Sequence, residues 1–405
     1  MTDPAVSSRP APASLAQIRI ARISTVPFYV VAQLKNQIAF LGQQGAKVTV
    51  VARGEPELAE FDHLAGVDGH AIDIPRNISP GRDFLALLRL WYFFRTRRIQ
   101  IAHSTTPKAG LLTALAAFIA GVPVRLHTFT GQPWVTMHGV KRWLARASDI
   151  VIGKLNTRCY TDSPSQRLFL IDQNIIDAKR VSVLGSGSLA GVDISRFCRA
   201  RFNPVECQAL RKKLGLPDAA AVLLFIGRIN GDKGVRELLR TFASLKARGS
   251  DAHLVFVGRF DTDGGVEGSI SAKDLENIQD VHIVGYTDTP EAYLAIADIL
   301  CLPSYREGFG TVVIEAAAMG VPTVGTDIYG LSDAVVHGET GILVPPRHVE
   351  ELTAALEKLL SDASLRATMG AAALRRAREK FDAVTFNQWV ADEYKSLLKT
   401  AGLGS

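Results

Sequence analysis

Hydrophobic residues along the chain alternate between short β-branched runs and longer segments with helical spacing. Ile18–Ile23 reads as a strand, helical spacing covers 29–44, and Lys47–Val51 reads as the next strand. Such a unit predicts parallel strands covered by helices, because parallel neighbours need a long crossover connection. The same alternation predicts further helices at about 83–96 and 107–120 and strands at 99–103, 122–127, 149–152, 158–161 and 181–184.

A second alternating series follows Leu214-Gly215-Leu216-Pro217. It predicts strands at 221–226, 253–257, 281–284, 299–302 and 321–324, and helices at 234–247, 290–297, 311–319, 348–360, 364–380 and 384–400. We therefore predict an α/β protein with two Rossmann-like, doubly wound domains that face each other across a cleft. The expected divisions are a disordered lead-in at 1–17, domains at 18–198 and 199–383, and a helix at 384–405 that packs back on the first domain.

Charge is distributed unevenly along the 405 residues, which hold 46 Lys and Arg against 40 Asp and Glu. Residues 1–200 contain 24 basic against 13 acidic residues, whereas residues 201–405 contain 22 against 27. A basic half joined to an acidic half indicates two domains with different duties. The basic half suits the phosphates of a lipid, a nucleotide or a nucleic acid, and ordinary solvated surface charge explains it equally well.

Several classes of protein are disfavoured by composition. The four cysteines have no metal-ligand spacing, which argues against a zinc site or a disulfide framework and fits a reducing compartment. The N-terminal segment is rich in Pro, Ala and Ser and lacks the apolar core of a signal peptide. The longest apolar run, Ala109–Val124, is shorter than the roughly 20 residues of a spanning helix. We expect no transmembrane segment.

A first candidate site is the loop between the strand at 221–226 and the following helix. It contains Gly227, Gly231 and Gly234 together with the cations Arg228 and Lys233. Glycines let the backbone approach a phosphate closely, and the helix N-terminus offers unpaired N–H groups. The loop fits neither a P-loop nor a dinucleotide fingerprint, so a glycine-containing βα turn without a ligand is the alternative.

A second candidate site begins at Glu307, in the turn after the strand at 299–302. Gly308 and Gly310 expose backbone N–H groups there, and Glu315 lies eight residues on, within an apolar helical segment. A carboxylate in such surroundings is costly to bury unless it binds a group such as a ribose diol. The alternatives are a capping charge at Glu307 and a solvent-facing position for Glu315.

These two motifs together resemble the retaining nucleotide-sugar glycosyltransferases of family 4, which have the GT-B fold. Gly191-Val192-Asp193-Ile194-Ser195-Arg196-Phe197 and His337-Gly338-Glu339-Thr340-Gly341 extend the resemblance over the ordered chain. The resemblance implies an acceptor-binding first domain and a second domain that binds the nucleotide sugar. Its implied catalytic residues are His127, Arg228, Lys233 and Glu307, and its implied donor contacts add Gly308, Phe309, Gly310, Glu315, Gly285, Tyr286, Ser24 and Thr25.

A narrower resemblance comes from His103–Gly110, His127–Trp134, Asp162–Arg167 and Gly185–Ser188. These segments look like bacterial transferases that extend polyprenyl-diphosphate-linked glycans, including N-acetylgalactosamine transferases. The implied donor is a UDP-N-acetylhexosamine or a related UDP-sugar, with a GDP-sugar and a soluble acceptor as the alternative. Lys108 and Arg167 are the expected acceptor-phosphate contacts. The first βα loop departs from the family, since Ser24-Thr25 stands where many members carry Gly-Gly.

No carboxylate nucleophile for double displacement is identifiable in the motifs. The resemblance implies that the acceptor attacks the sugar on the face that the leaving group departs from. Asp261-Thr262-Asp263 spells the D-x-D metal motif of the other glycosyltransferase fold, but it lies in a glycine-rich segment typical of a solvated turn. We predict no cofactor and no essential metal.

Residues 82–98 carry five arginines among aromatic and aliphatic residues. This pattern predicts either a basic amphipathic helix on an anionic membrane surface or an ordinary surface helix, and both readings stay open. We expect a cytoplasmic protein, with peripheral attachment to the inner face of the cytoplasmic membrane under the first reading.

Two rival classes fit the sequence less well. An NAD-dependent oxidoreductase needs a glycine-rich first turn, and a nucleic-acid-binding protein needs a recognition pattern that the basic half lacks. We therefore expect no nucleic-acid partner, and the sequence leaves the oligomeric state open.

Overall fold

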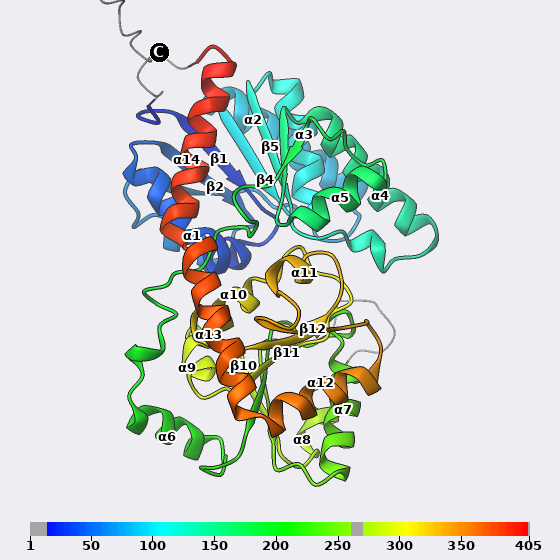
Figure 1. The fold of residues 1–405 in the computed structure, drawn as a ribbon. Coiled ribbons are helices and arrows are strands. Elements are labelled where there is room, and N and C mark those ends of the chain that lie inside the picture. The colour runs from blue at the N-terminus through cyan, green and yellow to red at the C-terminus, as the bar shows by residue number, and fades with distance from the viewer. Residues whose placement is uncertain (1–13, 261–269, 404–405) are drawn as a thin grey trace, which may run out of the picture. The chain divides into compact units, whose positions relative to one another are not determined.

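The computed structural model describes residues 14–260 and 270–403, which contain two parallel β-sheets (Figure 1). The first sheet has seven strands in the order β3-β2-β1-β4-β5-β6-β7, so the direction of winding reverses between β1 and β4. Its strands are β1 (Arg19–Ile23), β2 (Lys47–Ala52), β3 (Val67–Ala71), β4 (Ile101–Thr105), β5 (Val124–Phe129), β6 (Arg158–Thr161) and β7 (Val181–Ser182).

The connections of the first sheet are mainly helical, as parallel pairing requires. Proline occupies the first helical turn of α1, α2, α3 and α5, where its missing N–H costs no hydrogen bond. The helices are α1 (Pro27–Gln43), α2 (Pro80–Arg97), α3 (Pro107–Ala120), α4 (Gly139–Leu155) and α5 (Pro164–Asp172), with short 3₁₀ turns at Pro56–Phe61 and Pro133–Val135.

The second sheet has six strands in the order β10-β9-β8-β11-β12-β13, so its winding reverses between β8 and β11. The strands are β8 (Val222–Ile226), β9 (His253–Val257), β10 (Val281–Gly285), β11 (Ile299–Leu302), β12 (Thr323–Thr326) and β13 (Gly341–Val344). The central strands are apolar throughout, as expected of a parallel sheet with helices on both faces.

All helices of this second half except the last pack their apolar faces on one continuous core. The helices are α6 (Pro204–Lys213), α7 (Val235–Ala247), α8 (Lys273–Glu276), α9 (Pro290–Ala295), α10 (Thr311–Ala318), α11 (Leu331–Ala334), α12 (Val349–Ser361), α13 (Ala363–Lys380) and α14 (Ala383–Thr400), with 3₁₀ turns at Arg199–Arg201 and Gly231–Lys233. Among the helices of residues 14–260 and 270–403, none is both long and apolar enough to cross a bilayer.

The chain divides into two compact units, and each contains segments distant in sequence. The first unit comprises 1–127, 155–158 and 387–405, and the second comprises 128–154 and 159–386. Within the first unit, Leu15 is buried and the Gln17 backbone donates to Gly45. The residues of the predicted lead-in from 14 onward therefore pack on the first unit.

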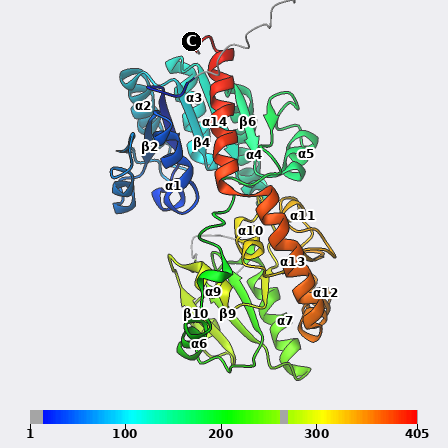
Figure 2. The same ribbon diagram turned by 60° about the vertical axis from the view of Figure 1, so that its left-hand side comes forward.

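The last helix, α14, lies beside the first sheet in both views (Figures 1 and 2). A buried polar cluster fastens it there. The Arg22 guanidinium donates to the Tyr394 hydroxyl at 2.7 Å and contacts His103 Nδ1 at 3.0 Å, while His103 Nδ1 lies 2.5 Å from the same hydroxyl. Arg22 is 2% exposed, so these partners replace the water that its charge has lost.

One expected strand is helical in the structure, and β3 and β13 are strands that were not expected. The strand expected at 149–152 lies inside helix α4, because Asp149 is held by the Trp134 indole N–H and the apolar run that follows is one face of that helix. Strand β3 was not expected, since Val67-Asp68-Gly69-His70-Ala71 has little apolar character. It pairs with β2 alone, at the edge of the sheet, where polar side chains are tolerated.

We predict that Tyr394→Phe lowers the free energy of unfolding of the first unit by about 1.5–3 kcal/mol. The substitution removes an acceptor from a buried guanidinium, and hydrogen bonds to charged groups contribute that much. Denaturant unfolding of the full chain measures the change. The control is Tyr92→Phe on α2, where the ring is 64% exposed and the effect should stay within about 0.5 kcal/mol. Equal stabilities of Tyr394→Phe and wild type would contradict the role given to this cluster.

Candidate functional site

The loops after β8 and β11 carry several of the charged residues that were predicted to bind a ligand. These two strands are neighbours, and the winding of the sheet reverses between them. In open α/β sheets, ligands bind beyond the carboxyl ends of the strands at such a reversal. Arg228 and Lys233 come from the first loop and Glu307 from the second, so the topology places the two sequence motifs at one point.

Glycine at position 234 allows the two loops to touch. Gly234 has φ of +66°, a left-handed conformation, and it is the last residue before α7. A Cβ atom at this position would overlap the carbonyl oxygen of Pro303, in the loop after β11. Only glycine, which has no Cβ atom, can adopt this left-handed conformation and also allow the Pro303 carbonyl to lie so close.

Lys233 and Glu307 form an ion pair across these loops. Their side chains are only 15% and 12% exposed, and Ser304 Oγ donates to the same Glu307 oxygen at 2.8 Å. Burial lowers the pKa of Lys233, the Glu307 carboxylate opposes that change, and the nearby Arg228 adds to it. The structure therefore brings three of the predicted residues, Arg228, Lys233 and Glu307, into one electrostatic group.

A second ion pair beside the first was missed by the sequence analysis. Arg306 donates to Asp232 Oδ2 through Nε at 3.1 Å and through Nη2 at 2.8 Å, and the Tyr305 backbone donates to the Asp232 carbonyl. Both side chains are immediate sequence neighbours of predicted residues. The motifs flagged the loops, but no local signal indicated that these two residues pair with each other.

Gly308, Phe309 and Gly310 were predicted to contact the donor. The Phe309 ring instead belongs to the core, where it is 2% exposed and packs edge-on against Phe381 at 5.2 Å. Only the backbone of Phe309 remains for a ligand. Gly310, with φ of +86°, is the N-cap of α10 and turns the chain into the helix.

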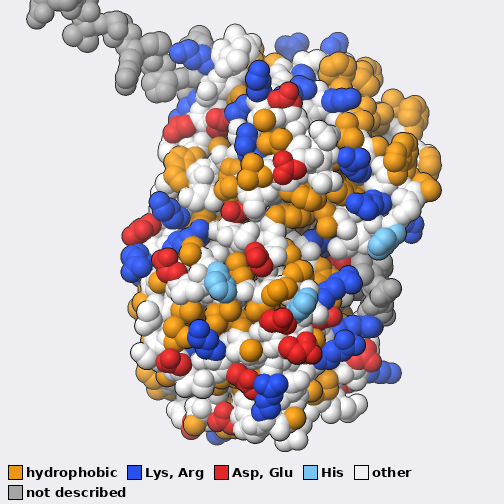
Figure 3. All heavy atoms as spheres, turned by 45° about the vertical axis from the view of Figure 1, so that its right-hand side comes forward, with side chains coloured by type: hydrophobic (Ala, Val, Ile, Leu, Met, Phe, Trp, Pro, Cys, Tyr) orange, Lys and Arg blue, Asp and Glu red, His pale blue; other side chains and the backbone are white. Residues whose placement is uncertain are grey.

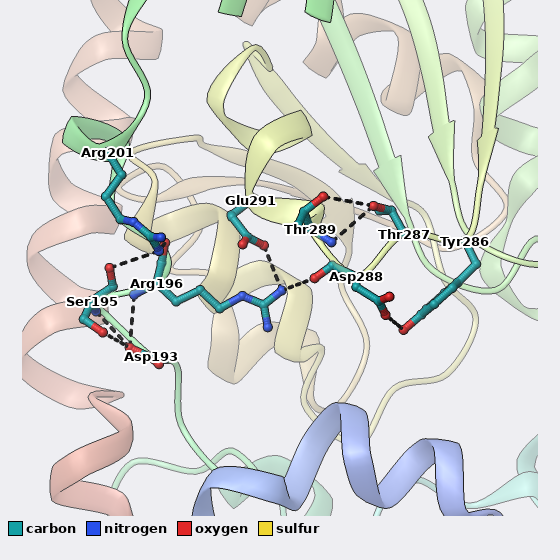
Figure 4. A network of polar contacts seen from close by, with 9 residues as sticks. All are labelled: Asp193, Ser195, Arg196, Arg201, Tyr286, Thr287, Asp288, Thr289 and Glu291. Carbon is teal, nitrogen blue, oxygen red and sulfur yellow. Dashed lines mark hydrogen bonds and ion pairs between the residues drawn. The ribbon is translucent and has the colours of Figure 1, made fainter. Parts of the chain in front are cut away.

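Glu315 lies on α10, and its charge is affected by Arg196 and Glu291, two members of the polar network drawn in Figure 4. Burial raises the pKa of Glu315 to about 7, Arg196 counteracts this, and Glu291 adds to it. Arg196 donates to Glu291 Oε2 at 2.9 Å and to the Asp288 carbonyl. Arg196 and Glu291 therefore set the charge environment of the predicted ribose ligand, and neither role was predicted.

The segment after β10 joins this network. Tyr286 donates its hydroxyl to Asp288 (Figure 4), and the Arg259 guanidinium lies 4.5 Å from the centre of the Tyr286 ring. Tyr286 is 42% exposed, and it follows Gly285, whose φ is +79°. Tyr286, one of the predicted donor contacts, thus forms a stacked pair with Arg259.

The predicted residues Ser24, Thr25 and His127 belong to the first unit. Ser24 and Thr25 are buried at the reversal of the first sheet, where the Thr25 backbone donates to Thr106 Oγ1 at 3.3 Å. His127 is 1% exposed, its Nδ1 lies 2.9 Å from Ser104 Oγ, and burial lowers its pKa to about 3. The imidazole is therefore neutral at physiological pH.

Lys108 and Arg167, the expected acceptor-phosphate contacts, both bind other parts of the protein. Lys108 pairs with Asp83 at 2.7 Å and donates to the Asn77 carbonyl. Arg167 donates to the carbonyls of Val181 and Ala178, each at 2.9 Å. A role in acceptor binding stays a prediction for both residues.

No group of three His, Cys, Asp or Glu side chains within residues 14–260 and 270–403 is arranged to hold a metal ion. The Asp261-Thr262-Asp263 segment lies outside the described residues.

Comparison with known proteins assigns the family. The family described as "Glycosyl transferases group 1" matches residues 207–376, and the family described as "Glycosyl transferase 4-like domain" matches residues 30–187. The chain is similar to the capsular polysaccharide biosynthesis glycosyltransferase CapM of Staphylococcus aureus, at 30% identity over 370 residues. That alignment covers 90% of this chain and 94% of CapM. The chain belongs to the group 1 glycosyltransferases.

Other similarities of this glycosyltransferase are partial in sequence or confined to the fold. The D-inositol 3-phosphate glycosyltransferase of Salinispora tropica is 35% identical over 222 residues, which cover 52% of this chain and 45% of that protein. The crystal structure of Anabaena HepE in complex with UDP and glucose matches with a TM-score of 0.78 at 18% identity. It covers 94% of this chain and 100% of HepE, and such neighbours establish the GT-B fold.

We predict that Gly234→Ala destabilises this glycosyltransferase by more than about 4 kcal/mol, because the new methyl group clashes with the Pro303 carbonyl. The matched control is Gly249→Ala at the other end of α7. Its φ is +83° and a Cβ there meets open space, so it should cost only the roughly 1–2 kcal/mol of left-handed backbone. Denaturant unfolding compares the two variants, and equal losses would refute the steric role of Gly234.

Proposed function

We propose that this glycosyltransferase is a retaining enzyme that transfers a sugar from a UDP-sugar to a polyprenyl-diphosphate-linked glycan. The donor is a UDP-N-acetylhexosamine or a related UDP-sugar, and the product belongs to a cell-surface polysaccharide or a glycoprotein glycan. The observation that carries the proposal is the buried Lys233–Glu307 pair at the reversal of the second sheet. It supplies a cation for a diphosphate and a carboxylate for sugar hydroxyls at adjacent positions.

The nucleotide part of the donor has matching groups in the second unit. Arg228 and Lys233 suit the two phosphates, Glu315 suits the ribose hydroxyls, and the Arg259–Tyr286 pair suits the base. HepE, which shares the fold, has been crystallised with UDP-glucose as well as with UDP and glucose. These observations support a uridine nucleotide as the donor carrier.

In the proposed reaction the bond between the anomeric carbon and the UDP oxygen breaks, and the acceptor hydroxyl forms its bond on the same face. The proton of that hydroxyl passes to the departing phosphate oxygen. Lys233 and Arg228 stabilise the charge that grows on the phosphate. Glu307 already accepts hydrogen bonds from Lys233 and Ser304, which favours a binding role for its carboxylate over a nucleophilic one.

The acceptor assignment is supported by the name of CapM, a capsular polysaccharide transferase, and by the surface of α2. Helix α2 packs on α3 and exposes large side chains. On the face of the molecule drawn in Figure 3, hydrophobic side chains also lie close to Lys and Arg side chains. The exposed residues of α2 are Phe84, Leu85, Leu88, Trp91 and Tyr92, interleaved with the arginines Arg89 and Arg95. Such a face suits the headgroup region of an anionic membrane, where a polyprenyl-linked acceptor resides.

A second candidate is a transferase that uses another nucleotide sugar and a soluble acceptor. The partial similarity to D-inositol 3-phosphate glycosyltransferases favours it, because inositol phosphate is a soluble acceptor.

We predict that UDP raises the melting temperature of the wild type and that Lys233→Met weakens UDP binding by about tenfold or more. A charge-assisted hydrogen bond to phosphate accounts for a loss of that size. Titration calorimetry with UDP, GDP and NAD measures it.

The control for this experiment is Lys246→Met, which removes another ion-paired lysine at the far end of α7 and should leave UDP binding unchanged. Stabilisation by GDP in place of UDP would select the second candidate. Stabilisation by NAD, with no response to any nucleoside diphosphate, would overturn both.

We also predict that the protein co-sediments with phosphatidylglycerol vesicles and much less with phosphatidylcholine vesicles. The double variant Phe84→Ser/Trp91→Ser should lose most of this binding, since it removes two exposed rings from α2. Val205→Ser, a change at an exposed apolar residue of α6, is the control. Vesicle binding that is unaffected by the double variant would remove α2 from the proposed membrane surface.

A further inference from the structure

Asp162 has a buried carboxyl group to which the candidate site assigns no role. It follows β6 directly and precedes Ser163, the N-cap of α5. The residue is 5% exposed, and its Oδ1 atom has no hydrogen-bond partner within the described residues. More than nine in ten buried polar groups in proteins are hydrogen-bonded, and an orphan costs about 1–3 kcal/mol. An unsatisfied carboxyl oxygen of this kind points to a partner that is not part of the polypeptide.

The other oxygen shows where this carboxyl is aimed. A Cβ atom built on Gly308 would lie 2.8 Å from Asp162 Oδ2, so the carboxyl packs directly against the backbone that follows Glu307. The carbonyl group of Thr130 contacts Gly308 from the same side, and a Cβ on Gly131 would lie 3.3 Å from the Gly308 nitrogen. Asp162 therefore reaches the turn that carries the predicted sugar-binding carboxylate.

The position of Asp162 is fixed by its own backbone and by its neighbours. Its N–H donates to Gln166 Oε1 at 2.9 Å, and its carbonyl accepts from the Ser188 N–H at 2.5 Å. Ser165, three residues on, accepts at its Oγ from the Gly330 N–H and donates to Asp333. Hydrogen bonds of the Asp162 backbone therefore position its carboxyl group against the Gly308 turn.

The charge state of this group suits a hydroxyl ligand. Burial raises the pKa of Asp162 to about 8, so the carboxyl is protonated at neutral pH and offers one donor and one acceptor. A sugar hydroxyl also donates and accepts, and the two groups can pair reciprocally. A neutral acid at this place avoids repulsion of the donor diphosphate, whose charge is met by Lys233 and Arg228.

We propose that Asp162 binds a hydroxyl group of the transferred sugar and contributes to the choice of that sugar. This inference rests on the proposed function, because it assumes a nucleotide-sugar donor at the Glu307 turn. It adds a residue outside the Gly227–Gly234 and Glu307–Glu315 motifs to the sugar subsite.

The test compares the binding of UDP with that of UDP-glucose, UDP-galactose, UDP-N-acetylglucosamine and UDP-N-acetylgalactosamine by titration calorimetry. For the UDP-sugar that the wild type binds most tightly, Asp162→Ala should weaken binding about tenfold, the size of a lost buried hydrogen bond, while UDP binding stays within about twofold. Asp162→Asn keeps a donor and an acceptor and should retain most of the affinity. Asp172→Ala, which removes an exposed carboxylate at the end of the following helix α5, is the control.

If Asp162 only stabilises the fold, Asp162→Ala should lower the melting temperature and weaken the binding of UDP and of UDP-sugars alike. That result would overturn the inference. Equal ratios of UDP-sugar to UDP affinity in wild type and Asp162→Ala would overturn it as well. If Asp162→Ala fails to fold, Asp162→Ser, whose hydroxyl is too short to reach the ligand, should show the same selective loss. If the wild type binds UDP and Asp162→Ala leaves the affinity ratio unchanged, only the inference about Asp162 fails and the proposed function stands. If the wild type binds neither UDP nor any UDP-sugar, the proposed function and the inference both fail.

Discussion

The buried ion pair between Lys233 and Glu307 is the interaction on which the rest of the site depends. Taking two charges out of water costs several kcal/mol for each ion, and only close pairing and added hydrogen bonds offset that cost. Here Ser304 supplies such a bond, and the loops after β8 and β11 must touch for the pair to form. That contact in turn requires adjacent strands at a reversal of the sheet and a glycine at position 234. The ion pair therefore depends on both the order of the strands and the left-handed glycine.

The sequence predicted those parts of the site that are formed by residues close together in the chain. Glycines beside cations after an apolar strand, and two glutamates eight residues apart, are visible without a structure. The pairing of Arg306 with Asp232 and the influence of Arg196 on Glu315 are not, because they join residues 74 and about 120 positions apart. Asp162 was noticed only as part of a motif. The lack of a hydrogen-bond partner for its Oδ1 atom within the described residues is a property of packing, which no spacing pattern encodes.

Secondary structure, too, was predicted where the sequence pattern is strong and was missed where tertiary contacts determine it. Long periodic segments such as α7 and the apolar strands β8 and β11 were predicted within a few residues, since burial on both faces leaves a strong pattern. The run Asp149-Ile150-Val151-Ile152 has the composition of a strand, yet it is helical because its context in α4 outweighs β propensity. Strand β3 carries no apolar pattern, and only its pairing with β2 makes it a strand. The pairing of Lys108 with Asp83 could not be predicted from the sequence, because the two residues lie on different helices.

Residues 201–405 carry more acidic than basic residues, although this half contains the groups proposed to hold a diphosphate. Local environment resolves this conflict. The Glu307 charge is balanced by Lys233, and burial raises the pKa of Glu315 to about 7, so that group is partly protonated at neutral pH. Asp162, which belongs to the same compact unit, has its pKa raised to about 8 by burial and is mainly neutral. The carboxyl groups nearest the proposed donor thus contribute hydrogen-bonding capacity with little net negative charge. Because a ligand anion responds to nearby charge more than to the net charge of a domain, Arg228 and Lys233 can dominate the local field within an acidic half.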